Sequence, residues 1–313
     1  MKFGLDVGVY GKLATQENIL ALATFADAAG FDSLWLADHV VFPTDIRSRY
    51  PYSPSGDFPV PTDDPILEPI ATMGVLIGAT KHVRIGTAVL VVPYRNPVLL
   101  ARMLITLDVL SKGRVILGAG TGWLAEEFEA LDSRDFKARG AVTDEWLEIY
   151  KRLSAGGQVS FDGEHYHLRS VYSAPRSVQR PHPPIFIGGT SNPALRRVAR
   201  LGDGWLSVGL AVEDLGERLL KLKALCVEQD RKFDEVMLYH KLFISIGEAR
   251  AGHDGRREPG TGSLAQVRDD LKKIADLGYE SIIVRDRSGD ATIQDQQLRQ
   301  FVDDVMPHVM SHV

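Results

Sequence analysis

An aspartate and a histidine, Asp38 and His39, follow an apolar run in "LWLADHVVFP". Imidazole can give or take a proton near neutral pH, so His39 could act as a general acid or base, with Asp38 either orienting its ring or capping the loop. The alternative is a histidine that is tied structurally to a loop. Because the pair stands at the end of a predicted strand, we favour the catalytic role.

A loop of small residues, Gly188, Gly189 and Thr190, joins a predicted strand to a predicted helix in "IFIGGTSNPALRR". Glycine lets a ligand approach the backbone, and the free N–H groups at a helix N-terminus attract anions. A phosphate group is the ligand that such a loop fits best. An ordinary tight turn explains the same residues equally well.

A second such loop, Gly120, Thr121 and Gly122, lies in "RVILGAGTGWLAEEF". Its spacing is not that of the dinucleotide-binding fingerprint. Either a smooth surface beside a flat ring or packing inside a barrel would account for it. The next residues, Glu126 and Glu127, are predicted to form the solvated first turn of a helix.

Short strand-like runs alternate with helical patterns along the whole chain, which predicts parallel strands joined by crossover helices. Eight such units favour a single-domain (β/α)8 barrel over an open doubly wound sheet. The site is then expected at the carboxyl ends of the strands. The eight predicted strands are residues 2–9, 31–40, 82–92, 114–122, 183–189, 204–210, 236–247 and 280–286.

Two insertions interrupt this alternation. Residues 158–169 read as a hairpin that turns at Asp162-Gly163. Residues 41–65 are too long for an ordinary connection and are rich in proline and aromatic residues, including Tyr50 and Phe58. We predict that they form a lid over the site, with a dimer contact as the alternative.

Composition excludes several classes of function. There are 36 Lys and Arg residues against 41 Asp and Glu, for a net charge of −5. No segment concentrates basic charge, which argues against binding to nucleic acid. A single cysteine and no Cys/His cluster with zinc spacing predict no metal site. No long apolar stretch or signal peptide is present, so we expect a cytoplasmic protein without membrane contact.

Five segments taken together resemble the bacterial luciferase-like flavin-dependent oxidoreductases, over nearly the whole chain. The branch that the chain resembles most is generally predicted to use the deazaflavin coenzyme F420 rather than FMN. The segments are "GFDSLWLADHVVFP", "SRYPYSPSGDFPVP", "VRIGTAVLVVPYRNPVLLA", "GRVILGAGTGWLAEEF" and "QRPHPPIFIGGTSNPALRRVARLGDGW".

This resemblance implies a cofactor at the carboxyl ends of the strands and, for most relatives, a homodimer. It places a bulge, often with a non-prolyl cis peptide, at Ala88–Val89 behind the cofactor ring. It also places the phosphate site at Gly188, Gly189 and Thr190 and His39 beside the reactive ring. Arg95 and Arg47 are candidates for the rim that would hold the charged tail of F420.

The chain departs from the related deazaflavin-dependent sugar-phosphate dehydrogenases. Trp123 stands where those enzymes carry an acid after the "GTG" of the fourth strand, and the first strand lacks their glutamate. We therefore expect a hydrophobic or aromatic substrate. The predicted pocket residues are Trp35, Phe42, Tyr94 and Trp123.

The expected activity is hydride transfer between F420 and an organic substrate. The first alternative is an FMN-dependent monooxygenase that uses molecular oxygen, with a separate reductase supplying the reduced cofactor. The second alternative is a catalytically inactive subunit that binds a cofactor or a partner.

Overall fold

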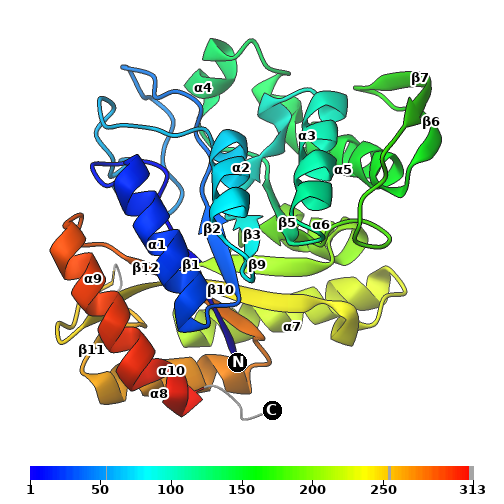
Figure 1. Ribbon diagram of the computed structural model, residues 1–313. Coiled ribbons are helices and arrows are strands. Elements are labelled where there is room, and N and C mark those ends of the chain that lie inside the picture. Colours follow the sequence, from blue (N-terminus) through cyan, green and yellow to red (C-terminus); the bar gives the residue numbers. More distant parts are fainter. Residues whose placement is uncertain (54, 253–254, 310–313) are drawn as a thin grey trace.

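The computed structural model describes residues 1–53, 55–252 and 255–309. Eight parallel strands close into a barrel with helices around it, which confirms the predicted (β/α)8 fold (Figure 1). Each barrel strand pairs with the next barrel strand along the chain, and the barrel closes because the first strand pairs with the last. The barrel strands are β1 (Lys2–Asp6), β2 (Ser33–Leu36), β3 (Arg84–Thr87), β5 (Val115–Gly120), β8 (Ile185–Gly188), β9 (Gly204–Val208), β10 (Met237–Ile246) and β12 (Ser281–Asp286).

The helices begin and end at residues suited to these positions. Thr15 caps α1 by accepting the N–H of Asn18, and Gly30 ends this helix with a φ of 83°. No helix among the described residues is long and apolar enough to cross a membrane. The main helices are α1 (Gln16–Ala29), α2 (Pro69–Ala79), α3 (Pro97–Leu110), α4 (Ala125–Ala130), α5 (Arg139–Ala155), α6 (Asn192–Leu201), α7 (Val212–Glu228), α8 (Leu264–Asp276), α9 (Ala291–Gln300) and α10 (Met306–Val309).

Alternation along the strands divides the core into two layers. Outward-facing residues pack against the helices in one large apolar cluster. Inward-facing residues form a smaller cluster inside the barrel, made of Trp35, Ile116, Phe186, Leu206, Tyr239 and Ile283. Trp35 has no exposed surface, and its indole N–H donates to Ser33 Oγ at 2.9 Å. It is therefore part of the barrel core, and the prediction that it lines the substrate pocket needs correction.

Both predicted insertions leave the barrel. The hairpin consists of β6 (Gly157–Asp162) and β7 (His167–Ser173), which project from one side of the molecule (Figure 1). The 41–65 segment, in which residue 54 lies outside the described part, carries no helix or strand. The residue after this segment, Ile66, is joined to the loop after β1 by an antiparallel bridge with Tyr10.

The third barrel strand is interrupted between β3 and the two-residue β4 (Leu90–Val91) by a bulge with a cis Ala88–Val89 peptide bond. A Cβ atom on Gly120 would lie 2.4 Å from Val89 Cγ2, and one on Gly188 would lie 2.5 Å from Val89 Cγ1. These glycines make room for the Val89 side chain. Of the two explanations that the sequence left open for the glycine loop after the fourth strand, packing inside the barrel therefore accounts for Gly120.

The close packing beside the bulge predicts that one added methyl group at Gly118 strongly destabilises the protein. A Cβ atom on Gly118 would lie 1.8 Å from the Thr87 carbonyl oxygen, which is backbone and cannot move aside cheaply. We expect Gly118→Ala to lower the free energy of unfolding by about 3 kcal/mol. Gly78→Ala on α2, where a Cβ atom meets nothing within 4 Å, is the matched control. Urea denaturation measures both variants, and equal midpoints would contradict this account of the bulge.

Candidate functional site

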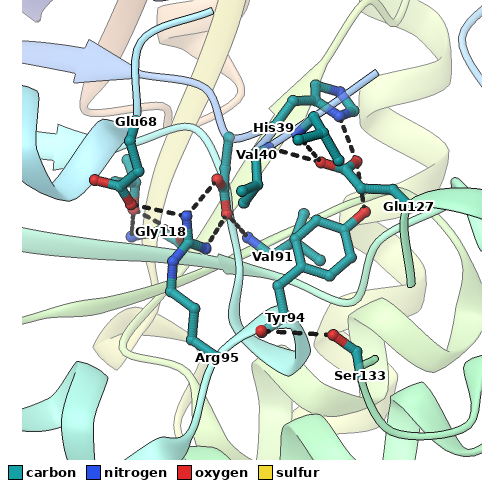
Figure 2. A network of polar contacts seen from close by, with 12 residues as sticks. His39, Val40, Glu68, Val91, Tyr94, Arg95, Gly118, Glu127 and Ser133 are labelled. Carbon is teal, nitrogen blue, oxygen red and sulfur yellow. Dashed lines mark hydrogen bonds and ion pairs between the residues drawn. The ribbon is translucent and has the colours of Figure 1, made fainter. Parts of the chain in front are cut away.

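His39 lies at the carboxyl end of β2, where its Nδ1 atom is 2.7 Å from Glu127 Oε2 (Figure 2). Both side chains are buried, with exposed fractions of 8% and 0%. Glu127 comes from α4, 88 residues further along the chain. The predicted solvated position of Glu127 is wrong, because the first turn of α4 faces the end of β2 rather than water.

The Glu127 carboxylate accepts three further hydrogen bonds. The Tyr94 hydroxyl donates to Oε2 at 2.8 Å, and the N–H groups of Val40 and Val41 donate to Oε1 at 2.6 and 3.2 Å. An ionised carboxylate accepts only, so the Nδ1 atom of His39 carries the proton in this arrangement. The other ring nitrogen, Nε2, is then the one with a free lone pair when the ring is neutral.

Asp38 does not orient His39. Its carboxylate binds the Arg95 guanidinium through two hydrogen bonds of 2.7 and 2.9 Å and accepts the N–H of Val91 at 2.8 Å. Arg95 also donates to Glu68 at 2.9 Å (Figure 2). Of the two roles open to Asp38, the structure supports the structural one, because the side chain joins the ends of β2 and β4.

The ion pair between Asp38 and Arg95 also bears on the prediction that Arg95 and Arg47 form a cationic rim for the F420 tail. The guanidinium of Arg95 is mostly buried between two carboxylates, so it is not available to a cofactor tail. The Arg47 side chain is 70% exposed, and its Nε atom forms an ion pair with Glu126 Oε1 at 3.6 Å.

Tyr94 is buried and directs its hydroxyl to Glu127, so this hydroxyl is not directed at a substrate as the predicted pocket role would require. Burial and the neighbouring charge of Glu127 raise the pKa of Tyr94 far above its ordinary value of 10. The hydroxyl therefore stays protonated and serves as a hydrogen-bond donor. It fixes the Glu127 carboxylate that in turn fixes His39.

Four aromatic rings surround the His39 ring. The centroid distances are 5.9 Å to Tyr10, 4.9 Å to Phe42, 5.3 Å to Phe58 and 6.1 Å to Trp123. Of the predicted pocket residues, Phe42 and Trp123 therefore lie together beside His39. Phe58 belongs to the 41–65 segment and is half-buried against the His39 ring, so this segment covers His39 with an apolar surface.

Glu126 holds the covering segment to α4. Its Oε1 atom accepts the N–H groups of Arg47 and Ser48 at 3.0 and 3.1 Å, and Ser48 Oγ accepts the N–H of Ala125 at 3.0 Å. Burial raises the pKa of the Glu126 carboxyl, but the hydrogen bonds from Ser48 and the backbone outweigh burial and keep this pKa below its ordinary value of 4.5. The adjacent acids Glu126 and Glu127 thus fix the cover and the histidine respectively.

The residues predicted to contact a cofactor form a partly exposed surface at the mouth of the barrel. It consists of Ala88, Val89, Thr121, Gly122, Gly188, Gly189 and Thr190, while Gly120 is buried beneath Val89. Gly189 has a φ of 103°, and Ser191 then caps α6 by accepting the N–H of Ala194. Small side chains beside a helix N-terminus fit a flat ring with a phosphate group. No cluster of three or more His, Cys, Asp or Glu residues suited to a metal occurs in the described part of the chain.

Comparison with known proteins gives a family match over most of the chain. A sequence model described as luciferase-like monooxygenase matches residues 3–253. An uncharacterized protein of Mycobacterium tuberculosis is 34% identical over 206 residues, which cover 66% of this chain and 70% of that protein.

Relatives of named activity are more distant. An FMNH2-dependent dimethylsulfone monooxygenase of Pseudomonas putida is 28% identical over 50% of this chain and 44% of its own. An F420-dependent glucose-6-phosphate dehydrogenase of Amycolatopsis mediterranei is 29% identical over 60% of this chain and 52% of its own. Among solved structures, an F420-dependent secondary alcohol dehydrogenase aligns with a TM-score of 0.81 over 99% of both chains at 17% identity, a likeness of fold.

The Glu126 contacts predict a cover that loosens in acid. A carboxyl whose pKa is lowered in the folded protein stabilises it above the ordinary pKa, and this stability is lost as the pH falls through the lowered value. We expect hydrogen-exchange protection of the Arg47 and Ser48 amides to hold down to about pH 5 and to fall at least about tenfold in stronger acid. Glu126→Gln should weaken the same protection at neutral pH, whereas Glu129→Gln at an exposed position should not. Protection that is independent of pH would contradict this role.

Proposed function

Because the chain belongs to the luciferase-like monooxygenase family, whose members are enzymes, we propose that it is an oxidoreductase that moves a hydride between coenzyme F420 and a hydrophobic or aromatic substrate. The main supporting observation is the Ala88–Val89 bulge, which lies partly exposed at the barrel mouth beside the enclosed His39. A bound deazaflavin would supply the hydride acceptor or donor.

In this proposal the chain holds the cofactor through two surfaces. Ala88 and Val89 support one face of its ring, and Gly188, Gly189 and Thr190 bind its phosphate group near the start of α6. The fit rests on the small side chains there and on the left-handed backbone of Gly189, which only glycine adopts without cost.

His39 manages the proton that accompanies hydride transfer. Glu127 holds the Nδ1–H group, so Nε2 is the atom that accepts a proton from a substrate hydroxyl or, in the protonated ring, returns it. The rings of Phe42, Phe58 and Trp123 exclude water from this position. They also provide an apolar surface for the body of the substrate.

A second candidate is an FMN-dependent monooxygenase that receives its reduced cofactor from a separate reductase. The relationship to the dimethylsulfone monooxygenase favours it. The glycine loop and bulge suit either cofactor, since both have a flat tricyclic ring. The third candidate, an inactive subunit that binds a cofactor or a partner, has less support because the His39–Glu127 pair is intact.

We further propose a homodimer. Several large apolar side chains stand exposed on the neighbouring helices α2 and α3, namely Val75, Leu99, Met103 and Leu110. Exposed apolar surface of this kind is typical of protein–protein contacts. Sedimentation of the purified protein tests this proposal, and a monomer at micromolar concentration would refute it.

The cofactor proposal is tested by titrating the cofactor-free protein with F420 and with FMN while following ligand fluorescence. We expect F420 to bind more tightly than FMN. Replacing Gly189 with valine should weaken F420, because a β-branched residue cannot adopt its φ of 103° without strain. Preference for FMN would favour the monooxygenase, and binding of neither cofactor would exclude both enzyme proposals.

Substitutions at His39 and Glu127 test the mechanism. We expect His39→Ala to keep cofactor affinity and to lose at least about a hundredfold in turnover, because a positioned acid or base contributes 10²–10⁴-fold. Glu127→Gln should lose about tenfold or more in turnover, because the His39 ring is no longer held in one orientation and one tautomer.

The control for these variants is His165→Ala on the distant hairpin, which should leave turnover unchanged. Normal turnover of His39→Ala would make this histidine structural. Normal turnover of a folded Glu127→Gln variant would show that Glu127 does not act on His39 in catalysis.

A further inference from the structure

One inward-facing layer of the barrel lies directly above the aromatic core, on the side of the mouth. Side chains two residues apart on a strand point to the same side, so residues two positions after the inward-facing core residues also point into the barrel. Lys241 follows Tyr239 on β10, Arg285 follows Ile283 on β12, and Asp6 occupies the corresponding place on β1. These three strands are neighbours in the barrel.

The composition of this layer is uneven. On the opposite strands the corresponding inward positions hold residues with small or no side chains, Ala88, Gly118 and Gly188. The β10, β12 and β1 side instead holds long charged side chains. A ligand at the mouth would therefore meet a flat apolar half and a charged half.

The charged half has more positive than negative charge. Asp6 is fully buried and forms ion pairs with Lys241 and with Arg285, the latter at 3.5 Å. Burial opposes ionisation of Asp6, but Lys241 and Arg285 outweigh it and lower the pKa of this carboxyl. One carboxylate thus pairs with two cations, of which Lys241 is buried and Arg285 is half-buried. The third nearby cation, Arg287, has its own acid, Glu258, at 3.0 Å.

Cross-linking three strands explains why Asp6 and one cation are present, but it does not require the second cation. Burying a cation is costly unless an anion accompanies it. Lys241 is only 6% exposed, and the Arg285 side chain is 18% exposed. An anionic group of a ligand would complete the charge balance of this layer.

One aromatic ring connects the cations to His39. Tyr10 lies between them, with its ring centroid 5.9 Å from that of His39 and 5.1 Å from the Arg285 guanidinium carbon. Tyr50 of the covering segment lies near the cations as well. Burial raises the pKa of its hydroxyl, and the positive charges of Arg285 and Arg287 oppose this effect. Tyr50 in turn contacts Trp123, with ring centroids 5.1 Å apart. Tyr10, Tyr50 and Trp123 thus connect the surroundings of Arg285 to those of His39.

We propose that Lys241 and Arg285 bind an acidic group of the substrate, which makes the substrate class a small molecule with an apolar or aromatic body and one carboxylate or similar anionic end. This inference rests on the proposed function, since it assigns the substrate to the same mouth. The acidic end then fixes the substrate against β10 and β12, and the reacting carbon lies toward His39 and the apolar half.

The test compares an acid with its neutral amide, 3-phenylpropanoate and 3-phenylpropanamide, by isothermal titration calorimetry with and without F420. We expect the wild-type protein to bind the acid at least about tenfold more tightly than the amide. Lys241→Met and Arg285→Met should each reduce this preference to about twofold or less, whereas Lys273→Met on the exposed face of α8 should leave it unchanged. Equal binding of acid and amide by the wild type, or no binding of the acid, would overturn the proposal.

Two further measurements keep the result unambiguous. Circular dichroism checks the fold of each variant, and if a methionine variant does not fold, competition by sodium sulfate in the wild type replaces it, with weakening of the acid alone as the expected result. The F420 affinity of Lys241→Met should stay within about threefold of the wild type. A larger loss of F420 affinity, with the acid preference intact, would place the cofactor at these cations and refute the proposal. Because the acid preference is measured without turnover, its failure is distinct from failure of the redox proposal.

Discussion

A single buried carboxylate, that of Glu127, connects the parts of the site. It accepts hydrogen bonds from the His39 ring, the Tyr94 hydroxyl and two consecutive backbone N–H groups at the end of β2. A buried carboxylate without these donors would be costly, and the donors without it would be unpaired. The loop after β2, the turn after β4 and the start of α4 are therefore fixed together, and the orientation of His39 follows from this arrangement.

The bulge in the third strand provides the second constraint. Val89 occupies space that Gly120 and Gly188 leave open, so the third, fourth and fifth strands of the barrel are adapted to one another. The same bulge leaves Ala88 and Val89 partly exposed at the mouth of the barrel. One half of the barrel mouth is apolar with small side chains, and the other half is charged. This combination suits a flat cofactor beside a small acidic substrate.

Much of the fold could be predicted from the sequence, because strands and helices alternate regularly and local signals such as Gly30 mark their ends. The position of the bulge came from the family resemblance. The contacts between side chains were harder to predict from the sequence. Glu127 follows the fourth strand in the chain but contacts His39 after the second strand, because the closed barrel brings these two loops together. The sequence leaves open whether Asp38 orients His39 or caps the loop, because its actual partner, Arg95, lies 57 residues further along the chain. The sequence predicts Trp35 as a pocket residue, but its side chain points into the barrel core.

The central claim is that Glu127 fixes His39 with its proton on Nδ1, and nitrogen-15 NMR of histidine-labelled protein measures this most directly. His39→Gln identifies the resonances of His39 among the nine histidines. At a pH where the ring is neutral, the account predicts a protonated Nδ1 and an unprotonated Nε2, and it predicts that Glu127→Gln allows both tautomers to be populated. A wild-type ring that carries its proton on Nε2, or a tautomer that Glu127→Gln leaves unchanged, would contradict it.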